Sequence, residues 1–293
     1  MSRTEELNFE QIPCFGVAGN FTGHLEQAGE AVDFAKTVVK EANAPKAIFP
    51  TYLPMGNISQ LTPEFLHVYP VDCKKIIYPE GEQKVQLEPE CGIYFDAVWN
   101  STGDKKQLVD LIPICFGASN DCSIRKEGAK KISIKKNWGK SSKGVSSKLI
   151  ELNSFSKEKS ILNNYNIVSF LQRGNEIYQY GEDSPVSEYS YVFEKLTYWM
   201  IDKFNNQKDE GPAENLNEYL KESGCPEKIF VSIGATRYTE YGQTNFLQPD
   251  DFSCVVVYPR DKYCQDNLKK MILEQNYCAP DISFLVQKVL MGE

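Results

Sequence analysis

The stretch LEPECGIYFDAVW at residues 87–99 has the alternation of a β-strand, in which successive side chains point to opposite faces of a sheet. One face collects mainly apolar side chains, from Leu87, Cys91, Ile93, Phe95 and Ala97. The opposite face collects Glu88, Glu90, Gly92, Tyr94 and Asp96. Glu88 and Glu90 therefore repel each other on one face of the strand unless a cation lies between them.

A divalent cation would remove this repulsion. Mg²⁺ and Mn²⁺ are typically held by a few carboxylates plus waters, which leaves positions for substrate oxygens. The best candidate for a third ligand is Asp121, at the end of an apolar strand-like run, because an unpaired charge is costly to bury there. The alternative is a solvated strand face for the two glutamates and a turn cap for Asp121. Spacing alone does not separate the two, because E-x-E pairs are common.

His24 follows a glycine-rich turn and opens a helical turn, a position from which side chains often reach a cleft. Glu26, Gln27 and Glu30 are near enough in sequence to orient it. A histidine paired with a carboxylate can activate water near neutral pH. The alternative is a surface or helix-capping histidine. The second histidine, His67, has no polar neighbours in sequence and is expected to be structural.

Periodicity and turn residues predict many strands and a few helices, mostly near the ends. Strands are expected at residues 13–21, 111–119, 130–138, 227–238 and 251–260, and hairpins at 73–99 and 165–185. Helices are expected at residues 24–28, 30–42, 105–109, 193–204, 264–276 and 280–290, and a mobile loop at 139–148. This pattern indicates an α+β fold on a large mixed sheet, and no linker divides residues 1–293 convincingly, so we expect a single domain.

The chain has 293 residues, 41% of them hydrophobic, and a net charge of −8, which argues against nucleic acid or an anionic membrane as a partner. Residues 125–148 form a cationic segment. It is either a solvated hairpin or loop, or a segment whose electrostatic field attracts a small anionic substrate.

The nine cysteines contain no CxxC pair and fit a reducing compartment. Without a secretory signal or an apolar span, the cytoplasm is the expected location.

Seven segments, taken in order, resemble motifs of the fumarylacetoacetate hydrolase superfamily. They are FGVAGNFTGHLEQAG, PKAIFPTYLP, LEPECGIYFDAV, CFGASNDCSIRK, WGKSSKG, RGNEIYQYGEDS and VSIGATRY with NFLQPDDFSCVVVYP, within residues 13–259. The resemblance implies a mixed β-roll or sandwich domain of the superfamily's C-terminal type, with peripheral helices.

The resemblance also implies roles for individual residues. The family's metal carboxylates correspond to Glu88, Glu90 and Asp121, and its active-site lysine to Lys143. Its recurring glutamine corresponds to Gln179. The threonine of its TGTP motif corresponds to Ala235, with Thr236 one position away.

The family's histidine corresponds to His24, but its partner glutamate does not carry over, because that position is Gln27. Glu26 is the nearest carboxylate and is expected to assist His24, with Glu30 as the second choice. We therefore expect His24, Glu26 and Lys143 to be catalytic, and Gln179 and Thr236 to bind substrate.

The resemblance implies a hydrolase or lyase that uses Mg²⁺ or Mn²⁺ to act on a C–C bond of a 2-oxo acid or β-diketo acid through a metal-bound enolate. Hydrolysis, decarboxylation and hydration share that intermediate, so the residues do not choose among them. We expect a small anionic substrate and a homodimer. The alternative is a non-catalytic ligand-binding protein that keeps the fold and the metal site. Gln27 and Ala235, which depart from the family's pattern, favour this alternative.

Overall fold

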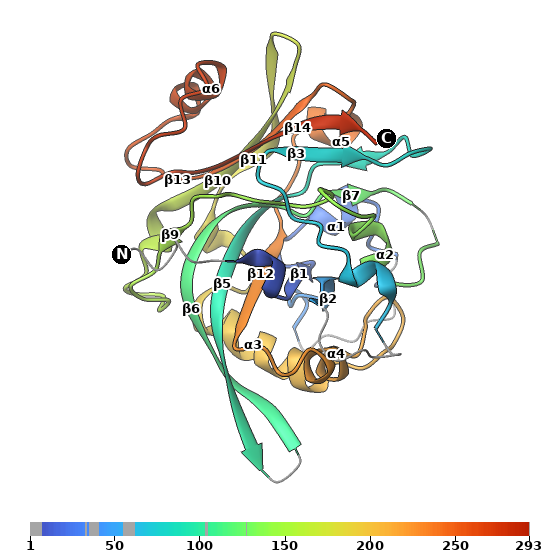
Figure 1. The fold of residues 1–293 in the computed structure, drawn as a ribbon. Coiled ribbons are helices and arrows are strands. Elements are labelled where there is room, and N and C mark those ends of the chain that lie inside the picture. Colours follow the sequence, from blue (N-terminus) through green and yellow to red (C-terminus); the bar gives the residue numbers. More distant parts are fainter. Residues whose placement is uncertain are drawn as a thin grey trace.

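A computed structural model describes residues 8–32, 34, 41–54, 62–102, 105–126 and 128–292, and its core lies between two mixed β-sheets (Figure 1). The first sheet has the order β2-β1-β12-β5-β6-β8, with β9 also paired to β6. Its strands are β1 Cys14–Ala18, β2 Ala47–Tyr52, β5 Pro89–Thr102, β6 Lys105–Asn120, β8 Gly144–Val145, β9 Ile150–Glu151 and β12 Lys228–Ala235.

The second sheet has the order β11-β10-β13-β14-β3. Its strands are β3 Lys75–Tyr78, β10 Tyr165–Arg173, β11 Glu176–Pro185, β13 Phe252–Pro259 and β14 Ser283–Met291. A separate pair joins β4 Val85–Gln86 to β7 Ser123–Ile124.

Helices lie around these sheets, which makes the fold α+β, as expected. The α-helices are α1 His24–Gln27, α2 Ser133–Lys136, α3 Phe193–Asn206, α4 Leu216–Glu222, α5 Glu240–Thr244 and α6 Gln265–Leu273. The 3-10 helices are η1 Phe9–Gln11, η2 Glu64–His67, η3 Ile161–Asn164 and η4 Val186–Glu188. None of the described helices is long and apolar enough to cross a membrane.

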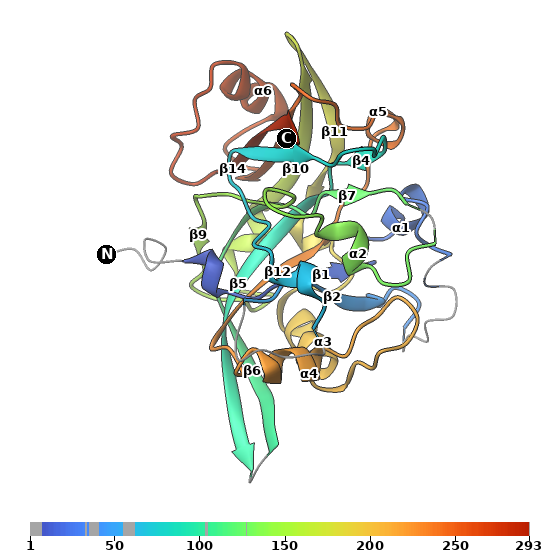
Figure 2. The same ribbon diagram turned by 45° about the vertical axis from the view of Figure 1, so that its right-hand side comes forward.

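Strand β13 shows how alternation builds the layers. Val255 and Val257 belong to the main core between the sheets. Cys254 and Val256 point the other way and pack with Leu268 of α6 in a second cluster. Period-two alternation therefore lets the second sheet contact the first sheet on one face and α6 on the other (Figure 2).

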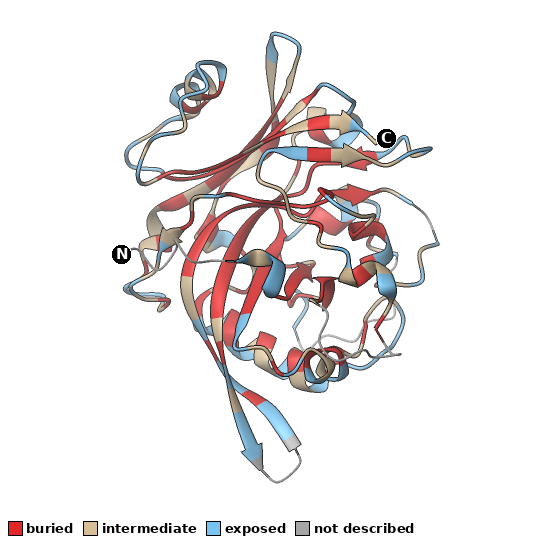
Figure 3. Ribbon diagram, in the orientation of Figure 1, coloured by how far each residue is buried: buried red, intermediate tan, exposed pale blue. Residues whose placement is uncertain are grey.

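The longest strands, β5 and β6, pair antiparallel and extend beyond the body as an arm (Figures 1 and 2). The strands are buried through the centre of the molecule and become exposed towards the end of the arm (Figure 3). Their register pairs Pro89 with Asn120 and Glu90 with Ser119. The first residues of β5 therefore lie beside the last residues of β6, deep inside the protein.

Several predicted elements are wrong. Residues 280–290 contain β14 instead of a helix, and residues 105–109 belong to β6. In both cases backbone pairing with neighbouring strands outweighs an ambiguous local pattern. Residues 73–99 are not one hairpin, because β3 pairs with β14 and β4 pairs with β7. The predicted helix at 30–42 lies largely outside the described residues.

The cationic segment differs most from expectation. Residues 130–138, expected as a strand, contain the helical turn α2. Residues 141–146, expected in a mobile loop, are buried, and β8 within them pairs with the end of β6. Neither part is a solvated surface loop.

Asn20 fastens the loop that leads into α1. It is 1% exposed, and its Nδ2 donates to the carbonyl oxygens of Tyr191 at 2.9 Å and Ile233 at 2.8 Å. Its Oδ1 accepts a hydrogen bond from the Tyr191 backbone N–H at 2.8 Å. One side chain thus ties the loop before His24 to β12 and to the segment before α3.

Replacement of Asn20 by alanine should lower the free energy of unfolding by about 2–4 kcal/mol, because it leaves buried backbone groups without hydrogen-bond partners. Urea unfolding followed by circular dichroism measures this change. The matched control is Asn206→Ala, since Asn206 is exposed and its side chain donates to its helix neighbour Asp202, so its loss should be small. Equal losses for the two variants would contradict this role for Asn20.

Candidate functional site

Three carboxylates meet at the buried end of the β5–β6 pair. Glu88, Glu90 and Asp121 each offer an oxygen, and these oxygens lie within 4.8 Å of one another. The three residues are 2%, 1% and 2% exposed, respectively. We call them the carboxylate cluster.

Backbone pairing positions the carboxylate cluster. The Asp121 N–H donates to the Glu88 carbonyl at 3.1 Å, which continues the pairing past the first residue of β5 and the last residue of β6. The Glu88 N–H donates to Asn120 Oδ1 at 3.2 Å. Glu90 Oε2 accepts from the Gly234 N–H of β12 at 2.7 Å, which connects the neighbouring strand to the site. The third carboxylate, Asp121, thus comes from the residue that directly follows β6.

Cationic side chains already contact the cluster. Lys136 Nζ, at the end of α2, lies 2.5 Å from Glu88 Oε2 and 2.7 Å from Asp121 Oδ2. Arg125 Nη2 lies 2.8 Å from Glu88 Oε1. Lys143 Nζ lies 3.4 Å from Asp121 Oδ1 and also donates to the Cys122 carbonyl. The cluster therefore has its own counter-charges.

A further carboxylate extends this ionic network. Glu30 Oε1 lies 2.8 Å from both Arg125 Nη1 and Lys135 Nζ. Four acids and four bases thus form one network among the described residues: Glu30, Glu88, Glu90 and Asp121 with Arg125, Lys135, Lys136 and Lys143. Glu30, Glu88 and Asp121 thus each have at least one cationic partner within the protein.

The surroundings shift the pKa values of the three carboxyl groups in different directions. Burial alone would raise the pKa of Glu88, but Lys136, Arg125 and His24 hold it well below its usual range. Burial, with Asp121 and Glu88 nearby, raises the pKa of Glu90 well above its usual range. Burial also raises the pKa of Asp121, against the opposing effect of Lys136 and Lys143. Glu88 is therefore the member most firmly held as an anion.

His24 is buried, 4% exposed, and its Nδ1 lies 2.9 Å from the Thr236 carbonyl oxygen. A carbonyl can only accept, so Nδ1 carries the proton and Nε2 is the basic nitrogen. Burial lowers the pKa of His24 to about 4, although Glu88 and Glu30 act in the opposite direction. The ring is therefore neutral near pH 7.

The three residues considered as partners of His24 lie in different places. Glu26 is exposed on α1. Gln27 bonds the backbone of Tyr238 with both ends of its amide, at 3.2 and 2.8 Å. Glu30 is buried and acts on the His24 pKa electrostatically. The geometry favours Glu30 over Glu26, because an exposed carboxylate is screened by water.

Thr236 and Gln179, the two residues expected to bind substrate, differ in burial and in hydrogen bonding. Thr236 is 0% exposed, and its hydroxyl has no hydrogen-bond partner among the described residues. Gln179 on β11 is half-buried and bonds the Gly181 carbonyl at 3.1 Å. Thr236 is the one with unused hydrogen-bonding capacity in the interior.

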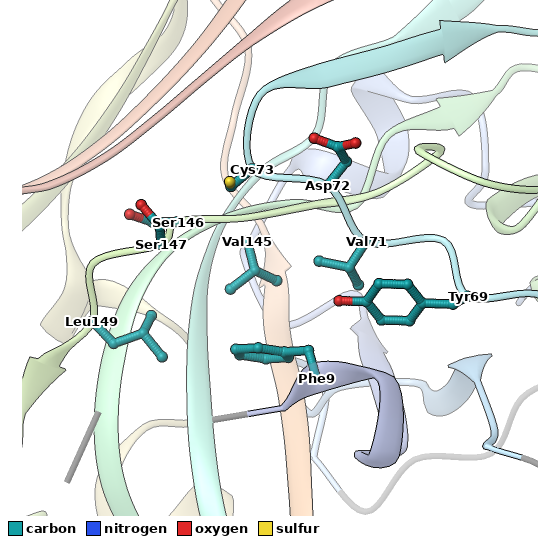
Figure 4. Close-up of a pocket in the computed structure, with 9 residues that line it drawn as sticks. All are labelled: Phe9, Tyr69, Val71, Asp72, Cys73, Val145, Ser146, Ser147 and Leu149. Carbon is teal, nitrogen blue, oxygen red and sulfur yellow. The ribbon is translucent and has the colours of Figure 1, made fainter. Parts of the chain in front are cut away.

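The space around the cluster is small. A cavity of about 10 Å³, room for roughly one water, is lined by residues that include Asp121, Lys143 and Ser232. A larger pocket of about 400 Å³, drawn in Figure 4, shares Val71 and Val145 with this cavity as lining residues. None of the three cluster residues lines the larger pocket.

The donor set of the cluster fits Mg²⁺ or Mn²⁺, since three buried carboxylates are hard oxygen ligands. The space between Glu88 and Asp121 nevertheless contains the Lys136 ammonium. The fit to a metal ion therefore depends on Lys136 leaving that space.

The sequence alone does not assign Arg125 and Lys136 to the site. Both belong to the cationic segment, for which the sequence predicts either a solvated loop or attraction of a substrate at a distance. One available signal was the presence of three acids expected to be buried in the same sheet, because buried carboxylates need cationic partners. Lys136 lies 48 residues from Glu88 in the sequence, and spacing does not reveal that the two side chains meet.

The His24 environment predicts a specific loss of stability in acid. The pKa is about 6.5 unfolded and about 4 folded, so the unfolded chain binds the proton first as pH falls. The free energy of unfolding should drop through this window, by about 2 kcal/mol between pH 7.5 and 5.0 from His24 alone. Urea unfolding of wild type and His24→Gln at both pH values measures this, and parallel pH profiles would refute it.

The comparisons with solved structures agree on the fold. A structure of Cg1458 with inhibitor is 12% identical, with a TM-score of 0.56, over 96% of this chain and 77% of that one. A 2-keto-3-deoxy-D-arabinonate dehydratase complexed with magnesium and 2,5-dioxopentanoate is 12% identical, with a TM-score of 0.53, over 96% and 73%. A candidate fumarylacetoacetate isomerase/hydrolase from Oleispira antarctica is 11% identical, with a TM-score of 0.53, over 95% and 93%.

At these identities the likeness shows the fold alone, and it confirms the fold expected from the sequence motifs. No curated protein matches the chain. A family model described as a family of unknown function, DUF5718, matches residues 30–289. The chain therefore belongs to the DUF5718 family, and it has the fold of the fumarylacetoacetate hydrolase superfamily.

Proposed function

We propose that this protein is an enzyme that acts on a C–C bond of a small 2-oxo acid or β-diketo acid, with Mg²⁺ or Mn²⁺ held by Glu88, Glu90 and Asp121. The observation that carries the proposal is the convergence of these three buried carboxylates within 4.8 Å. The fold adds support, because a dehydratase with the same fold is described as complexed with magnesium and a dioxo acid. When bound, the ion would act as a Lewis acid and orient substrate oxygens.

The protein's own groups would do the remaining work. Lys143, beside Asp121, would stabilise negative charge that develops on a substrate oxygen. His24, with Nδ1 bonded to the Thr236 carbonyl, would accept a proton at Nε2. The Thr236 hydroxyl, which has no described partner, would bond a substrate oxygen. Gln179 is proposed to contact the rest of the substrate.

Glu30 is the carboxylate proposed to assist His24, in place of Glu26. Its charge favours the protonated form of His24, which must exist briefly if His24 takes a proton. Glu30 itself is held by Arg125 and Lys135. The network would therefore stabilise the protonated histidine from a fixed position.

A non-catalytic ligand-binding protein is the second candidate, and one observation favours it. Glu88 and Asp121 already have cationic partners within the protein, and the cavity beside Asp121 and Lys143 has room for about one water. A protein of this kind would bind an anion or a cation without turnover. An activity assay with acylpyruvates and oxaloacetate, with and without Mn²⁺ or Mg²⁺, separates the two candidates.

Glu90→Gln should abolish Mn²⁺-dependent turnover in that assay and weaken Mn²⁺ binding by more than about 10²-fold, because it removes a ligand charge. Titration calorimetry measures the binding. Glu214→Gln is the matched control, since Glu214 is also a buried glutamate but bonds Ser133 at 2.5 Å outside the cluster. Unchanged Mn²⁺ affinity in Glu90→Gln, or metal-independent activity, would contradict the proposed metal site.

Lys143→Ala should lower kcat by about 10²–10³-fold, because the developing negative charge loses its cationic partner. It should not weaken Mn²⁺ binding, since Lys143 supplies no ligand. Lys140→Ala is the control in the same segment, because Lys140 is exposed. A parallel loss of turnover and of Mn²⁺ affinity would mean that Lys143 holds the site together instead.

A further inference from the structure

The Lys136 ammonium lies inside the carboxylate cluster. Its Nζ is 2.5 Å from Glu88 and 2.7 Å from Asp121, and the side chain is 3% exposed. The Nζ also lies 5.3 Å from the centre of the Phe49 ring, so an aromatic face borders it as well. These contacts make Lys136 a component of the site's interior.

An ion bound to both Glu88 and Asp121 at about 2.0–2.2 Å would have to lie between them, where Lys136 Nζ lies. The two cations therefore exclude each other sterically. Electrostatic repulsion leads to the same conclusion, because Lys136 Nζ already contacts both Glu88 and Asp121. A divalent ion added beside it would bring two cationic groups together in a buried region, which is costly.

We infer that Lys136 is the resident cation of the carboxylate cluster, and that a divalent ion enters only when the Lys136 side chain leaves the space between Glu88 and Asp121. This inference rests on the metal site of the proposed function. Lys136 is the last residue of the single helical turn α2, so its side chain must move for the space to become vacant. Lys136 would then act as a positioning residue that sets the affinity of the site for metal.

The test is direct Mn²⁺ binding, measured by titration calorimetry on wild type, Lys136→Met and Lys135→Met. Methionine keeps most of the lysine stem but removes the charge and the ammonium. Lys136→Met should bind Mn²⁺ about 10-fold or more tightly than wild type, because no ammonium competes for the two carboxylates. Lys135→Met is the matched control, since Lys135 is also buried but contacts Glu30, which lies outside the carboxylate cluster. This variant should change Mn²⁺ affinity much less.

Equal Mn²⁺ affinity in wild type and Lys136→Met would overturn the inference while leaving the metal site of the proposed function intact. An equal gain in Lys135→Met would also overturn it, because the effect would then be general charge removal. Absence of Mn²⁺ binding in a folded Lys136→Met would overturn both. Tighter binding in Lys136→Met without turnover of any 2-oxo acid would support the inference and count against the enzyme.

Lys136→Met leaves Glu88 and Asp121 without a shared partner, so that variant can fail to fold. A crystal of the wild-type protein soaked in Mn²⁺ then decides the matter. The expected result is Mn²⁺ bound to Glu88 and Asp121, with Lys136 Nζ farther than about 4 Å from both. Mn²⁺ in the cluster with Lys136 still in place, or no Mn²⁺ there, would overturn the inference.

Discussion

The antiparallel register of β5 and β6 is the constraint on which the rest of the site depends. The start of β5 lies beside the end of β6, so Glu88 and Glu90 meet Asp121 where both strands are buried. Carboxylates in that place cannot reach bulk water, and their charge must be met from inside the protein. The position of the surrounding cations follows from this requirement.

Those cations come from one part of the chain, the segment that carries Arg125, Lys135, Lys136 and Lys143. Buried ion pairs seldom add much net stability, because the cost of removing both charges from water offsets their attraction. The proposed binding of a cation at this site would give a network of this size a role beyond stability. In that proposal, the Lys136 ammonium holds the acids together until a divalent ion replaces it.

The fold itself says little about chemistry, since one fold supports many reactions. The function has to be argued from side chains, and here the side chains are unusual in two respects. His24 is neutral and buried, with its basic nitrogen set by the Thr236 carbonyl. Gln27, at the position where the superfamily has an acid, instead holds the backbone of Tyr238. Any proton transfer at His24 must then draw on the wider ionic network.

The local pattern of apolar and turn residues in the sequence predicted the helices and strands whose periodicity is unambiguous. The stripe of Phe193, Leu196, Met200 and Phe204 predicted α3, and the turn at residues 173–175 predicted the hairpin of β10 and β11. The pattern failed at β14, because its apolar residues suit a helix or a strand, and pairing with β13 and β3 decides.

The sequence by itself determined that two glutamates share a strand face and that Asp121 is the third acid to consider. Only the tertiary structure decided which cations meet them, because α2 is too short to read from periodicity and its contacts are made across the fold. It also placed Glu26 in solvent and Glu30 in the interior, which sequence distance from His24 could not distinguish. Alternation is a property of neighbouring residues, whereas the partner of a buried charge is chosen by three-dimensional proximity.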